Sequence, residues 1–447
     1  MDKLQFIDQT LRDAQQSLWG FKMSTDQLAP ILPVMDKVGY KAISTVGARG
    51  MIVTMRAFNE DPFERMRLLS KRLQKTPLRG SFWAWNLQGW DLEPLAAIEL
   101  WIKVQVANGI RSFWICDYQN LMDRLSHLVG IAKSEGAEVV VALLYASSPV
   151  HTDKHFEEKA RRLSEVRGID AIHVEDASGV LTPERTRELL PAIHRGTKGI
   201  PIEFHSHCSS GLAPLCYLEA MKLGFNTLHT AVSPLANGNS LPSIENILRN
   251  GHRLGFSSDI DMDSLKAVSD HFSSIAHEND LPTGKLSEYD VFLYEHQLPG
   301  GMMGTLKNQL SELGMGNRLD ELLEEVARVR RDFGYPVMAT PYSQIVGSQS
   351  VFNMTSGKRY KIVSDEVIKY AAGAYGEPDG PMDQDIKDKI LSSPKAKKFL
   401  NWKPPDVSLK DLRREIGSDL SDEQLLLRLL NPDGEVKDKL RRLYGGV

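Results

Sequence analysis

A His-x-His pair and an aspartate are the residues of this chain best suited to chemistry. The pair is His205-Ser206-His207, and Asp13 follows an apolar run near the N-terminus. Side chains alternate along a strand with period two, so both imidazoles point to the same side if the pair ends a strand. Two neutral imidazoles and a carboxylate suit zinc, manganese, cobalt or a similar divalent ion. We therefore expect a metal site at Asp13, His205 and His207; two loop histidines bonded to backbone are the alternative.

Arg12 and Arg79 are the two arginines that we expect to bind a substrate anion. Arg12 precedes Asp13, and its fixed charge beside a metal would stabilise a developing enolate or carboxylate. Arg79 begins another apolar run and could clamp a substrate carboxylate through two guanidinium nitrogens. The alternatives are an ordinary surface ion pair for Arg12 and a solvated arginine at the wrong end of its strand for Arg79.

The elements that must position these residues are short apolar runs alternating with amphipathic stretches up to about residue 240. The runs are Leu4–Asp8, Lys41–Val46, Gly80–Trp85, Ser112–Asp117, Glu138–Leu144, Ala171–Glu175, Ile202–His205 and Thr227–Val232. Eight successive strand–helix units favour one closed (β/α)8 barrel, which buries both faces of every strand and leaves no edge. An open, doubly wound sheet is the alternative fold. In a barrel, Arg12-Asp13, Asp117, Glu175-Asp176 and the His pair lie at the catalytic, C-terminal ends of the strands.

Beyond about residue 260 the pattern becomes helical. The expected helices are Asp263–Glu278, Thr305–Asp332, Asp365–Ala374 and Ser408–Arg414, separated by Gly/Pro-rich loops. We predict an α/β barrel domain over residues 1–290 and a mainly helical C-terminal domain over residues 291–447. The highly charged stretch Leu409–Tyr444 is predicted to form a solvated helical cap.

Composition excludes several classes of function. The 447 residues include 54 Lys plus Arg and 58 Asp plus Glu, for a formal net charge of −4. This balance gives no electrostatic reason to expect a nucleic-acid or anionic-membrane partner. No apolar run approaches the roughly 18–20 residues of a membrane span, and the N-terminus does not resemble a signal peptide. Three cysteines form no disulfide framework, so we expect a cytoplasmic protein without a transmembrane segment.

Several motifs resemble those of one enzyme family. Residues 8–18 read Asp-Gln-Thr-Leu-Arg-Asp-Ala-Gln-Gln-Ser-Leu. This stretch resembles the Asp-Thr-Thr-Leu-Arg-Asp-Ala-His-Gln-Ser-Leu motif of the carboxyltransferase domains of pyruvate carboxylase, the oxaloacetate decarboxylase alpha subunit and the transcarboxylase 5S subunit. Further similarity follows in order at residues 55–65, 147–152, 233–235, 294–301 and 340–347. The chain is identified as a divergent member of this family of metal-dependent barrel enzymes.

The resemblance implies a particular metal site. Its ligands would be Asp13, His205 and His207, and the family's fourth ligand is a carbamylated lysine. This chain has Glu175 at that position, and its carboxylate sits on a side chain shorter by roughly 3–4 Å. We expect Glu175 to serve as a fourth ligand if the metal or backbone moves, or through a water molecule. A ready-made carboxylate would remove the need for carbon dioxide to assemble the ligand.

The resemblance also implies a substrate and a proton carrier. A 2-oxo acid such as pyruvate or oxaloacetate would bind near Arg12, Gln16 and Arg79. Thr340 would carry a proton between carboxybiotin and the metal-stabilised enolate. The aromatic Phe82-Trp83-Ala84-Trp85 replaces a less bulky stretch of the family next to the substrate arginine. Because aromatic bulk is gained near the mouth, the substrate need not be pyruvate or oxaloacetate.

The biotin is expected on another polypeptide. Ala220-Met221-Lys222-Leu223 resembles a biotin attachment site, but its apolar spacing predicts a helix rather than an exposed hairpin. The expected partners are a biotin carboxyl carrier protein, with a biotin carboxylase or second transferase subunit, and further copies of this chain in a homo-oligomer. Two alternatives stay open: a metal-dependent lyase or decarboxylase that uses no biotin, and an inactive assembly subunit.

Overall fold

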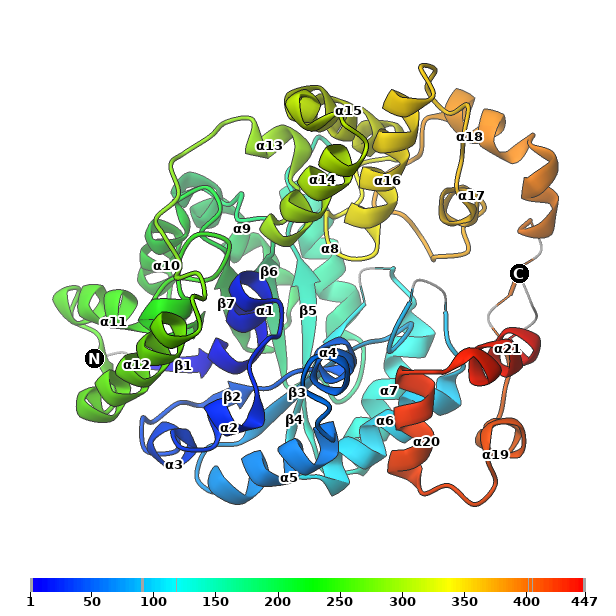
Figure 1. Cartoon of the computed structure of the whole chain (residues 1–447). Helices are drawn as coiled ribbons and strands as arrows, with labels where there is room; N and C mark the ends of the chain where they lie inside the picture. The colour runs from blue at the N-terminus through cyan, green and yellow to red at the C-terminus, as the bar shows by residue number, and fades with distance from the viewer. Residues whose placement is uncertain (1–2, 90–91, 118, 401, 404, 445–447) are drawn as a thin grey trace.

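Eight parallel strands form a closed barrel at the centre of the molecule (Figure 1). The computed structural model describes residues 3–89, 92–117, 119–400, 402–403 and 405–444. The strands are β1 Lys3–Asp8, β2 Ala42–Ser44, β3 Leu78–Trp83, β4 Ser112–Cys116, β5 Glu138–Leu144, β6 Ala171–Asp176, β7 Ile202–Ser206 and β8 Thr227–Thr230. Strand β1 pairs with β2 on one side and with β8 on the other, which closes the ring. The predicted barrel is confirmed, and the open sheet is excluded.

Helices cover the outside of the barrel, as parallel strands buried on both faces require. They are α4 Ala48–Phe58, α5 Pro62–Arg72, α6 Leu95–Ala107, α7 Met122–Ser134, α8 Asp153–Ser164, α9 Pro183–Gly196, α10 Ala213–Lys222, α11 Ile244–Arg253 and α12 Met262–Glu278. Thr182 shows how the sequence starts them: its hydroxyl accepts the Arg185 N–H at 3.1 Å, and Pro183 follows in the first turn. No helix of the described residues is both long and apolar enough to cross a membrane.

A group of short elements fills the loop after β1. A π-helical turn, Thr10–Ala14, is followed by α1 Gln15–Trp19, α2 Thr25–Leu28 and α3 Leu32–Met35. The π-turn carries Arg12 and Asp13 at the C-terminal end of β1. Single π-turns of this kind are frequent at functional sites.

The C-terminal part is helical, with one departure from expectation. Its helices are α13 Leu293–His296, α14 Gly300–Glu312, α15 Leu319–Asp332, α16 Tyr342–Thr355, α17 Asp365–Ala371, α18 Gln384–Leu391, α19 Leu409–Ile416, α20 Asp422–Leu430 and α21 Gly434–Leu443. The single helix predicted over Thr305–Asp332 is wrong, because the helix is interrupted between α14 and α15. Gly314 has φ +68° there, and a left-handed glycine after the last helical residues ends a helix.

The C-terminal helices divide into two groups with different packing. Helices α14 to α18 share a hydrophobic core with residues of β4 and β5, including Trp114 and Leu144, and lie together on one side of the barrel (Figure 1). Helices α19 and α20 pack instead against the barrel's outer helices α4 and α6, and α21 packs against α19. Leu425 and Leu430 are fully buried there, so the predicted solvated cap is wrong: one face of the charged segment is core. The domain division at residues 290 and 291 stays a prediction.

Candidate metal centre and active-site cavity

The three predicted metal ligands meet at the C-terminal end of the barrel. His205 lies near the end of β7, His207 directly follows the strand, and Asp13 comes from the turn after β1. His207 Nε2 is 3.3 Å from Asp13 Oδ1, and His205 Nε2 is 3.8 Å from Asp13 Oδ2. One donor atom from each residue lies within 4.8 Å of the other two, and all three residues are buried.

Unpartnered nitrogen atoms indicate that this trio is built for a ligand. Neither ring nitrogen of His205 has a hydrogen-bond partner, and neither does Nε2 of His207. An unpartnered buried polar atom costs about 1–3 kcal/mol, a cost that a coordinated ion removes. His207 Nδ1 is 2.7 Å from the carbonyl oxygen of Asn239, which fixes the tautomer that leaves Nε2 free. The donor set therefore fits a divalent metal.

The surroundings of the trio favour the ligating forms of Asp13 and His205, whereas, against the effect of burial, the charge of Asp13 raises the pKa of His207. Burial alone would raise the pKa of Asp13, but Arg12 and the two imidazoles hold that pKa well below its usual range. Arg12 donates to Asp13 Oδ2, and Ser17 Oγ donates to Oδ1 at 3.1 Å. Burial holds the pKa of His205 well below its usual value, so the imidazole is neutral. Asp13 is thus ready as an anionic ligand.

A cavity of about 300 Å³ opens beside the trio. Five residues predicted from the sequence line it together with Asp13: Arg12, Gln16, Glu175, His207 and Thr340. Thr340 comes from the helical C-terminal part, immediately before α16, so both parts of the chain build the cavity. His205 lies fully buried beside it. Residues separated by more than 300 positions in the sequence thus share one site.

Glu175 lies at the cavity wall but outside the converging trio. It belongs to β6, and its Oε2 has no hydrogen-bond partner and is 3.8 Å from His173 Nδ1. Burial raises the pKa of Glu175 to about 7, although Arg12 opposes the shift. The role of Glu175 as a fourth ligand stays a prediction.

Arg79 does not line the cavity that the other predicted site residues share. Its Nη1 and Nη2 donate to the two carboxylate oxygens of Glu203, Nη2 also donates to Glu138 at 3.1 Å, and Nε donates to Ser112 Oγ at 2.9 Å. The side chain is 1% exposed and does not line the 300 Å³ cavity. The substrate role of Arg79 stays a prediction; in this structure the carboxylates of Glu203 and Glu138 hold the guanidinium.

The sequence interpretation missed Glu203 and its partner His229. His229 Nε2 lies 2.9 Å from Glu203 Oε2, and Nδ1 lies 2.7 Å from Gln9 Nε2. A signal was present, since Glu203 precedes His205 by two residues and strand alternation puts both side chains inside the barrel.

A second histidine group lies deeper in the barrel. Donor atoms of His173, His205 and His229 also fall within 4.8 Å of one another. The rings of His173 and His229 stack at 4.1 Å with an interplanar angle of 14°, so their in-plane lone pairs run side by side and do not converge. Both nitrogens of His229 already have partners. The geometry favours the trio with Asp13.

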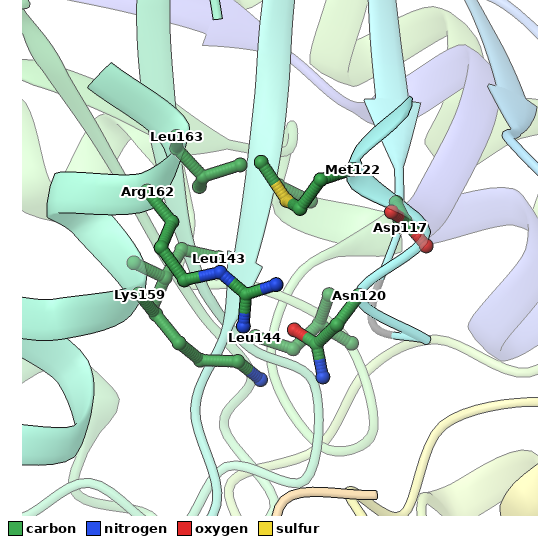
Figure 2. A pocket seen from close by; sticks show the side chains of 9 residues that line it. Asp117, Asn120, Met122, Leu143, Leu144, Lys159, Arg162 and Leu163 are labelled. Carbon is green, nitrogen blue, oxygen red and sulfur yellow. The ribbon is translucent and has the colours of Figure 1, made fainter. Parts of the chain in front are cut away.

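Asp117, which ends the fourth predicted strand, faces a different and smaller cavity. Figure 2 shows Asp117 and Asn120 on one side of it and Lys159 and Arg162 of α8 on the other. This cavity has a volume of about 20 Å³, room for little more than one water molecule. Burial raises the pKa of Asp117 to about 6. The described residues of this cavity include none of the predicted ligands.

Comparisons with known proteins agree with these features. Residues 3–271 match the family described as HMGL-like, and residues 293–438 match the conserved carboxylase domain. A pyruvate carboxylase subunit of Methanocaldococcus jannaschii is 35% identical over 441 residues, covering 97% of this chain and 77% of that protein. The 2-oxoglutarate carboxylase large subunit of Hydrogenobacter thermophilus is 32% identical over 441 residues, covering 96% of this chain and 67% of that protein.

A solved structure shows the same fold. The carboxyl transferase domain of Rhizobium etli pyruvate carboxylase, solved with pyruvate, superposes with a TM-score of 0.86 at 22% sequence identity. The match covers 100% of this chain and 78% of that chain. Barrel and helical part are therefore arranged as in that domain.

Proposed function

Since the chain belongs to the carboxyltransferase family that includes the archaeal pyruvate carboxylase subunit, we propose that it moves a carboxylate between biotin and a 2-oxo acid. The resemblance inferred from the sequence motifs is thereby confirmed at the level of the family. One observation carries the proposal: Thr340 of the helical part faces the same cavity as Arg12 and the Asp13–His207 ligand pair. A barrel lyase that uses no biotin has no need of that threonine.

In this proposal some residues of the cavity bind the anionic substrate and another, Thr340, transfers a proton. A divalent ion held by Asp13, His205 and His207 supplies Lewis-acid polarisation of the 2-oxo group when bound. Arg12 places a permanent positive charge next to it, where an enolate oxygen develops negative charge. Gln16, also at the cavity, offers an amide N–H for orienting the acid.

Proton balance assigns a role to Thr340. When a carboxylate leaves a biotin nitrogen for a carbon of the acid, a proton must pass from that carbon to the nitrogen. A threonine hydroxyl both donates and accepts hydrogen bonds, and Thr340 is half-buried in the cavity wall. Thr340 carries the proton within hydrogen-bond reach of both partners.

The carrier is a separate biotinylated protein in this proposal, loaded by a biotin carboxylase subunit. Lys222 is the last residue of α10 and pairs with Glu219 at 2.9 Å, so its tetrapeptide is helical and forms no hairpin. The proposal also places the enzyme in the cytoplasm, since all three cysteines are buried free thiols, and retains the homo-oligomer.

The test is transfer of labelled carboxylate from a carboxylated, biotinylated carrier domain to a panel of 2-oxo acids comprising pyruvate, 2-oxoglutarate and phenylpyruvate. The metal-loaded protein should label at least one acid, and Thr340→Ala should lower that rate by about 100-fold. Thr355→Ala, an exposed threonine at the end of α16, is the matched control and should keep the rate. No transfer to any acid, or an unchanged rate in Thr340→Ala, would contradict the proposal. Cleavage of a 2-oxo acid at a rate that does not depend on biotin would favour the lyase alternative.

A further inference from the structure

The arginine that the family resemblance assigns to the substrate carboxylate is closed off from the cavity. Arg12 and Trp114 line both the 300 Å³ cavity and a small neighbouring void. Arg79 lines the void but not the cavity. The void measures about 10 Å³, less than a carboxylate needs and at the lower limit for a single water molecule. Arg12 and Trp114 therefore form the shared wall between the cavity and the void that Arg79 lines.

The cavity offers little positive charge to replace Arg79. Among its described lining residues, Arg12 is the one arginine or lysine, and Arg12 already pairs with Asp13. One carboxylate of an acid can pair with Arg12 beside the metal. A second carboxylate would lie without a cationic partner and near Glu175, and an unpaired charge in a partly buried site is costly.

Tryptophan side chains form one wall of the same cavity. The rings of Trp83 and Trp114 lie 6.1 Å apart at an interplanar angle of 89°, making an aromatic corner, and the Arg12 guanidinium lies 4.9 Å from the centre of the Trp114 ring. The guanidinium of Arg49 lies 4.6 Å from the centre of the Trp83 ring and helps to hold it in place. Leu144 and Met302 add aliphatic surface. Such a corner gains free energy by covering a flat or branched apolar group.

From the closed-off arginine, the single cation and the tryptophan corner together, we infer that this site takes 2-oxo acids with one carboxylate and a bulky apolar side chain. It takes them in preference to pyruvate, which leaves the corner uncovered, and to dicarboxylic 2-oxo acids, whose second carboxylate has no partner. The inference rests on the proposed function for the 2-oxo acid and on Trp83, Trp114 and Arg79 for the side chain.

Isothermal titration calorimetry of the metal-loaded protein, without biotin, tests the inference through binding alone. We expect phenylpyruvate to bind about tenfold or more tightly than pyruvate and than 2-oxoglutarate, because burial of a phenyl group adds affinity. Trp83→Ala should reduce this preference to about threefold or less. Leu254→Ala removes an apolar side chain that is 46% exposed outside the cavity and should leave the preference unchanged.

The contrary outcomes are equally definite. Pyruvate or 2-oxoglutarate binding as tightly as phenylpyruvate, or no binding of phenylpyruvate, would overturn the inference. A titration with free biotin identifies the other possible occupant of the corner: if Trp83→Ala weakens biotin and leaves phenylpyruvate unaffected, the corner serves the carboxyl donor and the inference is overturned. Carboxyl transfer to pyruvate without any phenylpyruvate preference would leave the proposed function standing and remove only the inference.

Discussion

Two clusters of histidine, carboxylate and arginine lie inside the same barrel, yet they differ in how their hydrogen bonds are satisfied. In the upper cluster, Asp13, His205 and His207 converge beside the cavity, both nitrogens of His205 lack a hydrogen-bond partner, and Nε2 of His207 faces Asp13 alone. In the lower cluster, Arg79 and Glu203 are joined by two hydrogen bonds, and His229 is bonded on both sides. The difference shows that residue type alone does not identify a ligand site. Both ring nitrogens of His173 also lack hydrogen-bond partners, but His173 faces a void of only about 10 Å³, so unsatisfied donors must also converge beside an open cavity.

The two clusters share strand β7, and this makes the comparison sharper. Glu203 and His205 are two residues apart on the strand, point to the same side and are both fully buried. Their heights in the barrel differ: Glu203 lies nearer the N-terminal end, away from the cavity, and His205 lies nearer the mouth. We therefore expect the lower cluster to stabilise the barrel and, under the proposed function, the upper cluster to carry the chemistry.

The largest expected effect comes from breaking the lower cluster. Glu203→Gln leaves the guanidinium of Arg79 with less negative charge in a dry interior, so the free energy of unfolding should fall by about 3–5 kcal/mol. Urea denaturation measures this. The control is Glu157→Gln, which breaks the exposed pair with Arg195 and should change stability by less than about 1 kcal/mol. An equally small effect of Glu203→Gln would remove the structural role from the lower cluster.

The same substitution has a predictable pH dependence. Burial opposes ionisation of Glu203, but Arg79 outweighs it and the pKa of Glu203 lies below its ordinary value of 4.5. A lowered pKa stabilises the folded protein fully above pH 4.5, and this contribution is lost as the pH falls toward the folded-state pKa. The stability difference between wild type and Glu203→Gln should therefore shrink below pH 4.5. A difference that grows in acid would contradict this assignment.

A smaller effect is expected at the edge of the upper cluster. Glu175 lines the cavity without joining the trio, so Glu175→Gln removes a charge that acts on the metal through water or a shifted geometry. Metal affinity should fall by about 10–100-fold, as measured by competition with a chromophoric chelator. Complete loss of metal would make Glu175 a direct ligand, and no change would remove it from the site.

Sequence reasoning predicted the barrel well because eight parallel strands repeat one pattern of apolar runs. It placed the third strand at Gly80–Trp85, whereas β3 spans Leu78–Trp83. The reason is Arg79: an arginine inside a buried strand makes sense only once Glu203, distant in sequence, is seen to hold it. Helix α16 was missed for a related reason, since most of its residues are buried and no amphipathic period marks it.

Within the site, ligand chemistry and family motifs predicted different residues. Asp13, His205 and His207 were predicted from ligand chemistry alone and converge in the structure. Thr340 was an ordinary turn residue by spacing, and only the family resemblance singled it out. The role that the motif assigns to Arg79 stays a prediction, because its hydrogen-bond partner Glu203 is distant in sequence and could not be foreseen from the motif.

Metal content of a matched pair of variants tests the central claim most directly. Wild-type protein, His207→Gln and His229→Gln would be stripped with chelator, reloaded with Zn²⁺, Mn²⁺ or Co²⁺, desalted and measured by elemental analysis. We predict about one divalent ion per chain in wild type and in His229→Gln, and a loss of nearly all metal in His207→Gln. Wild-type protein without metal, or His207→Gln with as much metal as wild type, would contradict a metal centre at Asp13, His205 and His207.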